Sequence, residues 1–442
     1  MMEVNIDKIP RIGGHASIYV EIIENRVRTR FSVDEFRGFE KFLINRAIED
    51  IPYYVSRVCG ICEVSHLLAS TKALENGLGV EIPINAKLLR NILLSASVIQ
   101  SHILHFIYMG VHDIVNPLEP VIDPLKTLNE YSKYIKPLLN LRAIAKRLFE
   151  IIGGRKIHPV TVIIGGLTRI PDKDSLNEVI KNLKTLLPRV IESIDFWLSK
   201  ISELPHQLKI ENPMNTAALL NGSELELYDG DVELRSPNGE SIARFKPHHY
   251  LDFITEEYYD CGFSKSSYIK SLGIEQGIYR VGPLPRILRP IKLRDNAASL
   301  MNKYNSELKH CHFSYNVSRL IEVLHLAEDI CEKLQKLTIS NRIRVPVELR
   351  EGEGIGIVEA PRGILIHHYR WDEKGIVKYV NIITPTAQNT LPISKDVQIN
   401  VQKLISEIPR NKLRYLIAVI VRSYDPCIPC AGHRILVKIK HH

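Results

Sequence analysis

Cysteine is scarce in this sequence, with seven residues among 442. So few cysteines exclude a fold that is held together mainly by disulfide bonds. The sequence also lacks internal repeats, low-complexity segments and a linker rich in proline, glycine and serine. Its apolar fraction of 45% and charged fraction of 24% are ordinary for a globular protein, which excludes disorder, collagen and coiled coil as the main state. We therefore expect residues 1–442 to form one large unit.

Charge of one sign is not concentrated anywhere in the chain. The net charge of +8 is small for this length, and basic residues are scattered among acidic ones, so nucleic acid is not an expected partner. The first ten residues include acids and lack an apolar segment, so they show no secretory signal, and we expect a cytoplasmic protein. The longest stretch without Asp, Glu, Lys or Arg runs from Asn91 to His112. Its serines and histidines favour a helix buried in the protein over a transmembrane segment.

Hydrophobic periodicity predicts a predominantly helical α+β fold with small antiparallel sheets. The expected helices cover 33–48, the segment after Cys62 to about Gly77, 85–113, 126–152, 173–203 and 313–339. The expected strands are a hairpin over 16–31 that turns at Glu24-Asn25, a small meander around 216–246, and two runs over 355–370 and 376–384.

Four of the seven cysteines form two Cys-x-x-Cys pairs, Cys59 with Cys62 and Cys427 with Cys430. This spacing lets two thiolates bind one ion, and four sulfurs favour zinc, iron–sulfur or other thiophilic metals. A local zinc ribbon is excluded because 364 residues separate Cys62 from Cys427. A structural zinc that closes the fold, a redox disulfide pair and a catalytic metal remain open on spacing alone.

Ionisable residues flank both pairs and favour a catalytic metal. Arg57 and His66 accompany the first pair, and Asp425 and His433 accompany the second. A structural zinc knuckle does not need so many charged neighbours, whereas a catalytic metal uses them to orient its ligands and to move protons. We expect long buried helices to surround this metal site.

With these motifs the sequence resembles the large subunit of nickel–iron hydrogenases, most like the cytoplasmic group 3 type. The similar segments are spread over nearly the whole chain: 11–15 (RIGGH), 36–43 (FRGFEKFL), 56–66 (SRVCGICEVSH), 101–113 (SHILHFIYMGVHD), 359–363 (EAPRG), 384–389 (TPTAQN) and 425–433 (DPCIPCAGH). In combination these motifs are specific for the family.

The resemblance implies a nickel–iron centre whose iron carries carbon monoxide and cyanide. Cys59 and Cys427 would be terminal nickel ligands, and Cys62 and Cys430 would bridge nickel and iron. Arg57 and His66 would lie around this cofactor.

The resemblance also assigns roles to residues outside the cysteine pairs. Arg362 would lie over the metals, held by Asp113 and Asp425 as carboxylate partners. Pro385 and Thr386 would contact the cyanide ligands. Glu40 and His433 would bind a magnesium ion.

The chain departs from the family pattern at Gly13, where the family has a glutamate that carries protons from a terminal cysteine. Glu63, which is adjacent to Cys62, is our candidate for a substitute acid. Nine residues, Arg434 to His442, follow His433 and correspond to the tail that family precursors lose during maturation. We interpret the histidines of 91–112 as satisfied core groups. The Gly-rich segment 351–356 is not a phosphate loop, because it opens no helix.

The function implied is reversible oxidation of dihydrogen to protons and electrons, an oxidoreductase activity. Electrons would pass to a small subunit with iron–sulfur clusters and to further electron-transfer subunits, and maturation proteins would insert the metals. Two alternatives are a subunit of a related sulfur-reducing complex and a non-catalytic scaffold closed by zinc.

Overall fold

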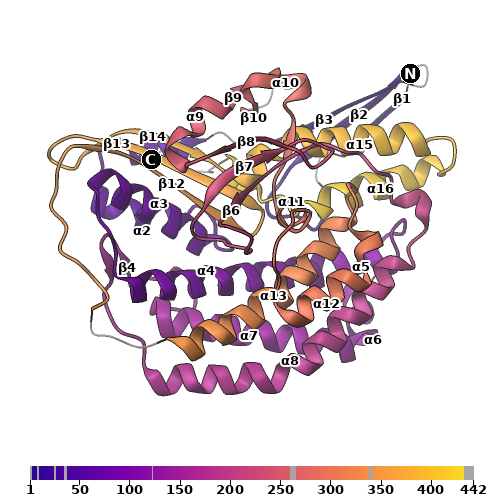
Figure 1. Cartoon of the computed structure of the whole chain (residues 1–442). Coiled ribbons are helices and arrows are strands. Elements are labelled where there is room, and N and C mark those ends of the chain that lie inside the picture. Colours follow the sequence, from indigo (N-terminus) through magenta and orange to yellow (C-terminus); the bar gives the residue numbers. More distant parts are fainter. Residues whose placement is uncertain are drawn as a thin grey trace, which may run out of the picture.

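Four long helices form one layer of the molecule (Figure 1). They are α4 (Ile84–His105), α7 (Ser132–Gly153), α8 (Lys173–Ser202) and α13 (Ser314–Lys336). The computed structural model describes residues 2–6, 9–23, 26–33, 37–121, 123–258, 265–337 and 342–432. Helix α4 packs against α7 and α13, and α8 packs against the same two helices. The predicted helices over 85–113, 173–203 and 313–339 therefore exist with nearly the expected bounds.

Helix α4 does not stop at His105 but continues through one π-helical turn, Phe106–Gly110, into α5 (Val111–Val115). A π turn inserts an extra residue and is frequent at functional sites. The segment Ile84–Val115 is the one helical stretch among the described residues that is long and apolar enough to cross a membrane, and 83% of its most apolar window is buried inside the protein. Such burial is typical of a core helix.

A second layer contains the three-stranded antiparallel sheet β12 (Gly352–Ala360), β13 (Gly363–Trp371) and β14 (Val377–Ile383). Helix α3 (Glu63–Leu78) packs against β12 and β13. A Cβ atom on Gly354 or Gly356 would lie 1.9 Å from the carbonyl oxygen of Ala73 or 2.1 Å from that of Ala69. The Gly-rich segment therefore serves close helix–sheet packing, in agreement with our rejection of a phosphate loop.

The prediction of one strand-like run over 355–370 was wrong in one respect, because the chain reverses direction at Pro361-Arg362. Strands β12 and β13 pair in antiparallel register from Gly352–Trp371 to Ala360–Gly363. Gly363 adopts φ +129°, a conformation that only glycine reaches without strain. Arg362 thus lies on the tight turn between two buried strands rather than within one.

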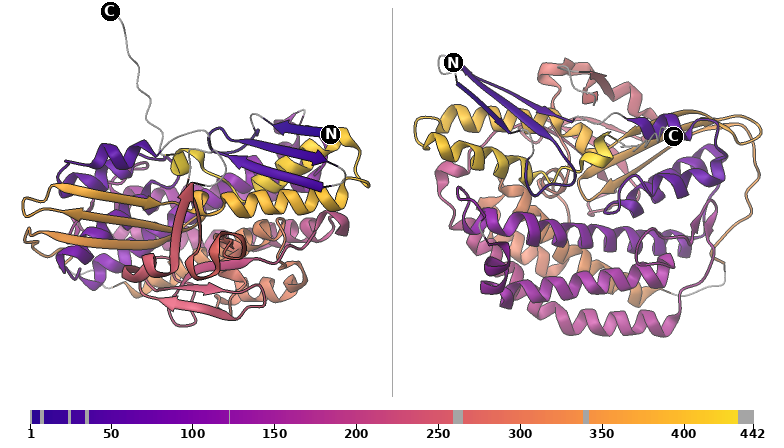
Figure 2. Two further views of the ribbon diagram at one scale, coloured as in Figure 1. Left: turned by 90° about the horizontal axis from the view of Figure 1, so that it is seen from above. Right: turned by 180° about the vertical axis from the view of Figure 1, so that it is seen from behind.

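The remaining strands form smaller sheets, of which the N-terminal one lies at the other end of the molecule from β12–β14 (Figure 2). The predicted hairpin over 16–31 exists as β2 (Ser17–Ile23) and β3 (Arg26–Ser32), and its turn residues lie outside the described residues. A further strand, β1 (Met2–Ile6), pairs with β2. The predicted meander is part of a four-stranded sheet in which one edge strand is parallel: β11 (Tyr279–Arg280), β6 (Asn215–Leu220), β7 (Asp231–Arg235) and β8 (Ser241–Phe245). Two two-stranded sheets are β4 (Val162–Ile163) with β5 (Gly166–Leu167), and β9 (Ile254–Tyr258) with β10 (Lys265–Ile269).

Short helices connect these layers. They are α1 (Gly38–Leu43), α2 (Ile51–Val55), α6 (Pro124–Glu130), α9 (Tyr250–Phe253), α10 (Gly273–Gln276), α11 (Pro283–Ile287), α12 (Asp295–Lys303), α14 (Pro385–Gln388), α15 (Thr390–Leu404), α16 (Arg410–Ser423) and α17 (Ile428–Gly432). The predicted helix over 33–48 ends early, at Leu43, because the backbone of Ile44 is extended, and residues 34–36 of the prediction lie outside the described residues. One buried apolar cluster extends from Ile9 to Ala431. The observed fold confirms the predicted predominantly helical α+β class.

Candidate metal centre

The four paired cysteines converge on one place although Cys59 and Cys427 are 368 positions apart in the sequence. All four sulfur atoms lie within 4.8 Å of one another, and all four residues are buried. Cys59 Sγ and Cys427 Sγ are 3.3 Å apart, and Cys62 Sγ and Cys430 Sγ are 3.0 Å apart. The two pairs therefore form one four-sulfur group, as a single metal site requires.

Each cysteine pair lies at the start of a helix. Cys59 belongs to the loop after α2, and Cys62 immediately precedes α3. Cys427 immediately precedes α17, which contains Cys430. The N-terminal loop fixes this second segment, because Gly13 pairs with Cys427 as a parallel bridge and its carbonyl accepts the Ile428 N–H at 2.7 Å.

The thiols of the cluster ionise as a coupled group. Hydrogen bonds from the other three thiols, that of Cys427 foremost, hold the pKa of Cys59 well below its ordinary value. The pKa values of Cys62 and Cys430 are well above theirs, for Cys62 mainly through Cys427 and for Cys430 mainly through burial. Four buried thiolates repel one another, so the fully ionised cluster requires a cation. This donor set fits a thiophilic metal centre.

Arg362 faces this cluster from the turn between β12 and β13. Its Nη2 donates to Asp425 Oδ1 at 2.9 Å, and its Nε donates to the Asp425 carbonyl. Burial alone would lower the pKa of Arg362, but Asp425 and then the thiols of Cys427, Cys62 and Cys59 raise it above its ordinary value. The Nη1 of Arg362 and the Oδ2 of Asp425 are buried without a hydrogen-bond partner. A fixed cation with a free donor therefore lies beside the sulfurs.

The predicted pairing of Asp113 with Arg362 was wrong. Asp113 accepts two hydrogen bonds from Arg422, at 2.7 and 2.8 Å, and one from Arg11 at 2.7 Å. Both of its oxygens are thus engaged by other arginines. The sequence showed these two arginines but gave no sign that the π turn would carry Asp113 towards them.

Thr386 connects the second active-site loop to the cysteine cluster. Its Oγ1 accepts the backbone N–H of Cys427 at 3.0 Å, so its own proton remains available to a further acceptor. Thr386 is 2% exposed, and Pro385 precedes it in α14 and is also buried. Both predicted residues therefore lie against the segment that carries Cys427.

Glu63 and His66 lie on the first turn of α3, which begins directly after Cys62. Burial raises the pKa of Glu63 from its ordinary 4.5 to about 7, and its Oε2 has no hydrogen-bond partner. His66 is buried, with its Nδ1 3.0 Å from the Nε2 of His367. Burial lowers the pKa of His66 to about 4, so the ring is neutral near pH 7.

Arg57 and Glu40 make their contacts elsewhere than at the sulfurs. Arg57 stacks on Tyr53, 3.4 Å from the ring centroid, and donates to Ser56 Oγ at 2.8 Å, which does not support a cofactor contact. Glu40 pairs with Arg37 and accepts the Ile382 N–H at 2.7 Å. His433, its predicted partner at magnesium, lies outside the described residues, as do residues 434–442.

Two histidines of the buried α4 segment, which we interpreted as satisfied core groups, have a partner on Nε2 only, because the Nδ1 of each is buried without a hydrogen-bond partner. His102 Nε2 lies 2.6 Å from Glu322 Oε2, and His105 Nε2 lies 2.7 Å from the carbonyl of Arg422. Sequence reasoning missed Glu322 because it lies on α13, 220 residues away.

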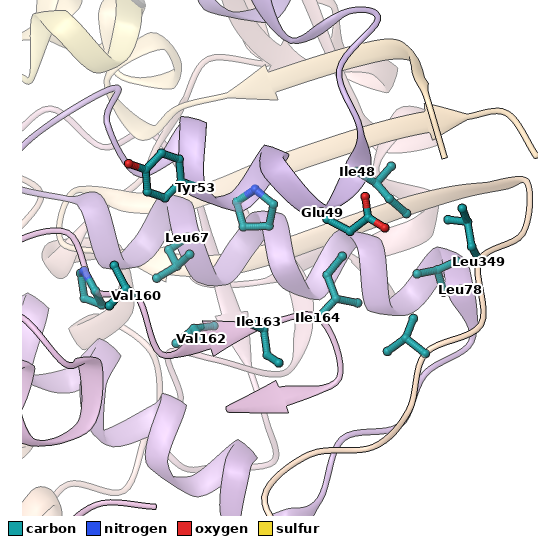
Figure 3. A pocket seen from close by; sticks show the side chains of 13 residues that line it. Ile48, Glu49, Tyr53, Leu67, Leu78, Val160, Val162, Ile163, Ile164 and Leu349 are labelled. Atoms are coloured by element: carbon teal, nitrogen blue, oxygen red, sulfur yellow. The ribbon is translucent and has the colours of Figure 1, made fainter. Parts of the chain in front are cut away.

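An apolar groove of about 410 Å³ lies between α3 and the β4 segment (Figure 3). Its side chains come from segments far apart in the sequence: Ile48, Glu49, Pro52, Tyr53, Leu67, Leu78, Pro159, Val160, Val162, Ile163, Ile164, Val347 and Leu349. Tyr53, Val160 and Leu349 are exposed. Since Arg57 stacks on Tyr53, the groove adjoins the loop that carries Cys59.

Comparison with known proteins matches the whole architecture. The family described as "Nickel-dependent hydrogenase" matches residues 37–137 and 198–433. The chain is 32% identical to a vhc-type F420-non-reducing hydrogenase chain of Methanococcus voltae, over 98% of this chain and 96% of that protein. It is 29% identical to the alpha chain of sulfhydrogenase 2 of Pyrococcus furiosus, over 98% and 99% of the two chains. A crystal structure of an NAD+-reducing [NiFe]-hydrogenase in the H2-reduced state superposes with a TM-score of 0.89 at 28% identity, covering 98% of this chain and all of that one.

Proposed function

This chain belongs to the nickel-dependent hydrogenase family, and we propose that its four clustered cysteines hold the nickel–iron centre of a hydrogenase large subunit. The resemblance seen in the sequence is thereby confirmed, and the chain is an oxidoreductase that interconverts dihydrogen with protons and electrons. The observation that carries the residue assignment is the convergence of four buried sulfurs within 4.8 Å beside an arginine with a free donor.

The cysteines divide into two roles in this proposal. Cys59 and Cys427 would hold nickel, and Cys62 and Cys430 would hold nickel together with iron. The bound centre, with carbon monoxide and cyanide on its iron, would supply the site where dihydrogen is cleaved. The Thr386 hydroxyl would donate its proton to a cyanide nitrogen, and Pro385 would pack beside it. The hydrogen bond from Cys427 N to Thr386 Oγ1 supports this orientation of the hydroxyl.

Arg362 serves as the fixed cation or base at the cleavage site. Asp425 orients its guanidinium through Nη2 and leaves Nη1 free towards the sulfurs. A charged donor held in a dry site stabilises developing negative charge more strongly than it would in water. Asp113 supports the site indirectly. It binds Arg422, which lies three positions before Asp425 in the chain.

Protons leave through Glu63 in this proposal, since Gly13 cannot carry them. The buried carboxyl with an unpartnered oxygen, one residue from Cys62, supports the role. In E63Q the deuterium–proton exchange per nickel should fall by about tenfold or more, because a positioned acid contributes at least that factor. Unchanged exchange would remove Glu63 from the path.

Magnesium binding by Glu40 and His433 stays a prediction. Two oxygens meet near Arg37 in the described residues, the carboxylate of Glu40 and the carbonyl of Ile382, which are the kind of ligand that magnesium prefers. Arg37 donates hydrogen bonds to both oxygens, so the ion would have to displace that guanidinium.

Electrons leave to a partner, because the described residues contain no further cluster of metal-binding cysteines. We assign the docking face to the surface where Gly60 and Tyr53 are exposed, with the groove of Figure 3 receiving an apolar side chain of an iron–sulfur protein. One relative, from Archaeoglobus profundus, is itself named as an iron–sulfur chain of an F420-non-reducing hydrogenase. Further electron-transfer subunits, maturation proteins that remove residues 434–442, and a cytoplasmic location stay predictions.

Elemental analysis with infrared spectroscopy of the purified complex tests the assignment. We expect about one nickel and one iron per chain, together with bands of bound carbon monoxide and cyanide. The variant C62S should lose the metals and the bands. C311S is the matched control, because Cys311 is equally buried but contacts Ser314 instead of the cluster. Zinc alone in the wild-type chain would instead support the scaffold alternative.

Sulfur reduction is the second candidate, favoured by the similarity to the alpha chain of sulfhydrogenase 2. Hydrogen-dependent formation of sulfide from polysulfide by the complex would support it.

A further inference from the structure

We propose that Arg286 is a positioning residue of the hydrogenase reaction, which holds the turn that carries Arg362. The inference rests on the proposed role of Arg362 at the metal centre. Arg286 lies on α11 and is only 1% exposed. It makes no contact with the four cysteines among its hydrogen bonds, so any effect on turnover must pass through the turn.

The guanidinium of Arg286 bonds directly to the backbone before Arg362. Its Nη1 donates to the carbonyl of Ala360 at 3.2 Å, and its Nη2 donates to the carbonyl of Pro361 at 3.3 Å. These are the two residues that precede Arg362 on the turn. The position of their carbonyls therefore determines where the Arg362 side chain begins.

Two buried carboxylates hold Arg286 itself. Glu322 accepts hydrogen bonds from Nε and Nη2, each at 2.6 Å, and Glu359 accepts one from Nη1 at 2.7 Å. Both carboxylates are fully buried. Loss of one partner from such a buried ion pair leaves an uncompensated charge, which is strongly destabilising. Conformations that separate Arg286 from Glu322 and Glu359 are therefore unfavourable.

The carboxylates are in turn fixed to separate elements. Glu322 on α13 bonds to His102 of α4 at 2.6 Å, and the other oxygen of Glu359 accepts the Leu219 N–H of β6 at 2.8 Å. Arg286 thus joins the helix layer and the four-stranded sheet to the turn. A single flexible contact would not fix the turn from two directions in this way.

The opposite side of the turn is closed by packing. A Cβ atom on Gly363 would lie 2.5 Å from Val281 Cβ, and one on Gly282 would lie 3.1 Å from the Arg362 carbonyl. Tyr315 OH donates to the Val281 carbonyl at 3.1 Å and holds that segment in place. The turn therefore lies between the Val281 segment and Arg286, and loss of Arg286 frees one side of it.

Only arginine can make all of these contacts. Its planar fork offers donors to two carboxylates and two carbonyls at once, whereas lysine has one nitrogen and three donors. The guanidinium of Arg362 has to lie within about 0.5 Å of its productive position beside the sulfurs, which is the usual tolerance for catalytic groups. A displacement of about 1 Å can cost about a hundredfold in rate.

The test compares R286K with R90K in the purified complex. Arg90 is the matched control: it is equally buried and forms a bidentate pair with Glu75 at 2.8 Å, and among the described residues its hydrogen bonds reach neither the Arg362 turn nor the two carboxylates that hold Arg286. We expect R286K to keep its nickel and its cyanide and carbon monoxide bands, while kcat per nickel falls by about tenfold or more at nearly unchanged KM for dihydrogen. R90K should lose thermal stability to a similar extent and keep kcat. R286M should lower kcat further than R286K.

Two outcomes would overturn the proposal. One is a kcat per nickel in R286K equal to that of R90K, and the other is R286K without nickel beside R90K with nickel, which would make Arg286 a folding residue only. R362K separates this proposal from the proposed function. If R362K keeps full turnover, the role of Arg362 itself is wrong; if R362K loses turnover while R286K keeps it, only the role of Arg286 is wrong.

Discussion

At the scale of single residues, Gly13 marks the clearest departure from the family pattern, and its surroundings leave room for a side chain. A Cβ atom there would lie 3.9 Å from Cys427 Sγ, with no neighbour closer than 3.4 Å. Gly13 also lies outside the left-handed region of backbone conformation. The backbone at Gly13 would therefore accept a Cβ atom without strain or close contact.

We expect G13E to raise deuterium–proton exchange per nickel by about tenfold, because it places an acid beside Cys427. The adjacent Gly14 is the control position. Its φ is +93° and a Cβ atom there would lie 2.7 Å from Pro429 Cδ, so G14A should destabilise the protein by about 1 kcal/mol or more. Exchange that stays at the wild-type rate in a nickel-replete G13E would show that the first proton transfer is not limiting.

At the scale of elements, the pairing of α4 with α13 depends on a neutral histidine. Burial lowers the pKa of His102 to about 4, against an ordinary 6.5, while its Nε2 bonds to Glu322. The unfolded chain therefore binds the additional proton first as pH falls. The contribution of the neutral His102 to the free energy of unfolding is fully present above pH 6.5 and is lost as pH falls towards 4. The total loss is at most about 3 kcal/mol.

The variant H102Q keeps a nitrogen donor for Glu322 and removes the titration. In urea unfolding we expect its stability to change less between pH 7.5 and pH 5 than that of the wild type. H206Q, at an exposed histidine, serves as the control. An equal pH dependence in H102Q and wild type would contradict the expectation.

The packing of α3 on β12 places both halves of the site. Cys62 precedes α3 and Arg362 follows β12, so the distance between these two elements sets the distance from arginine to sulfur. G354V would drive a side chain into the carbonyl of Ala73, which lies 1.9 Å from where the Cβ atom would stand. We expect a nickel-free, unstable protein, since overpacking of this kind costs at least about 1–3 kcal/mol.

The control for G354V lies on the same sheet. R370V places the same valine side chain at an exposed position of β13, where it meets no carbonyl, and should keep nickel with at most a small loss of stability from the lost contact with Tyr379. Nickel content and the thermal midpoint of the two purified variants decide the matter. Normal nickel in G354V would show that α3 and β12 can separate without harm to the site.

At the scale of the whole molecule, the groove of Figure 3 predicts where the iron–sulfur partner docks. V160D places a carboxylate in this apolar surface and should raise the Kd of the partner by about tenfold or more, since an unpaired charge in an interface costs more than about 1.4 kcal/mol. L125D is the control, because Leu125 is 70% exposed on α6 and does not line the groove. Co-purification of the subunits measures both; equal losses, or none, would contradict the assignment.

Much of the fold and of the site could be predicted from sequence because those features are local. Apolar periodicity determined α4, α8 and α13, and the Cys-x-x-Cys spacing identified Cys59, Cys62, Cys427 and Cys430 as one class of ligand. The predicted helix over 33–48 and the single run over 355–370 were less accurate. Their ends depend on an extended Ile44 and on a turn at Pro361-Arg362, which apolar periodicity does not register.

The sequence by itself therefore determined which residues can bind a metal, because that property belongs to the side chains and their short spacing. Only the tertiary structure decided which charges face each other. Asp113 meets Arg422 across 309 positions and leaves Arg362 to Asp425, and Arg286 reaches the turn from another element. The physical reason is that partners of buried ions are selected by packing and desolvation, and both depend on contacts between elements that are distant in the chain.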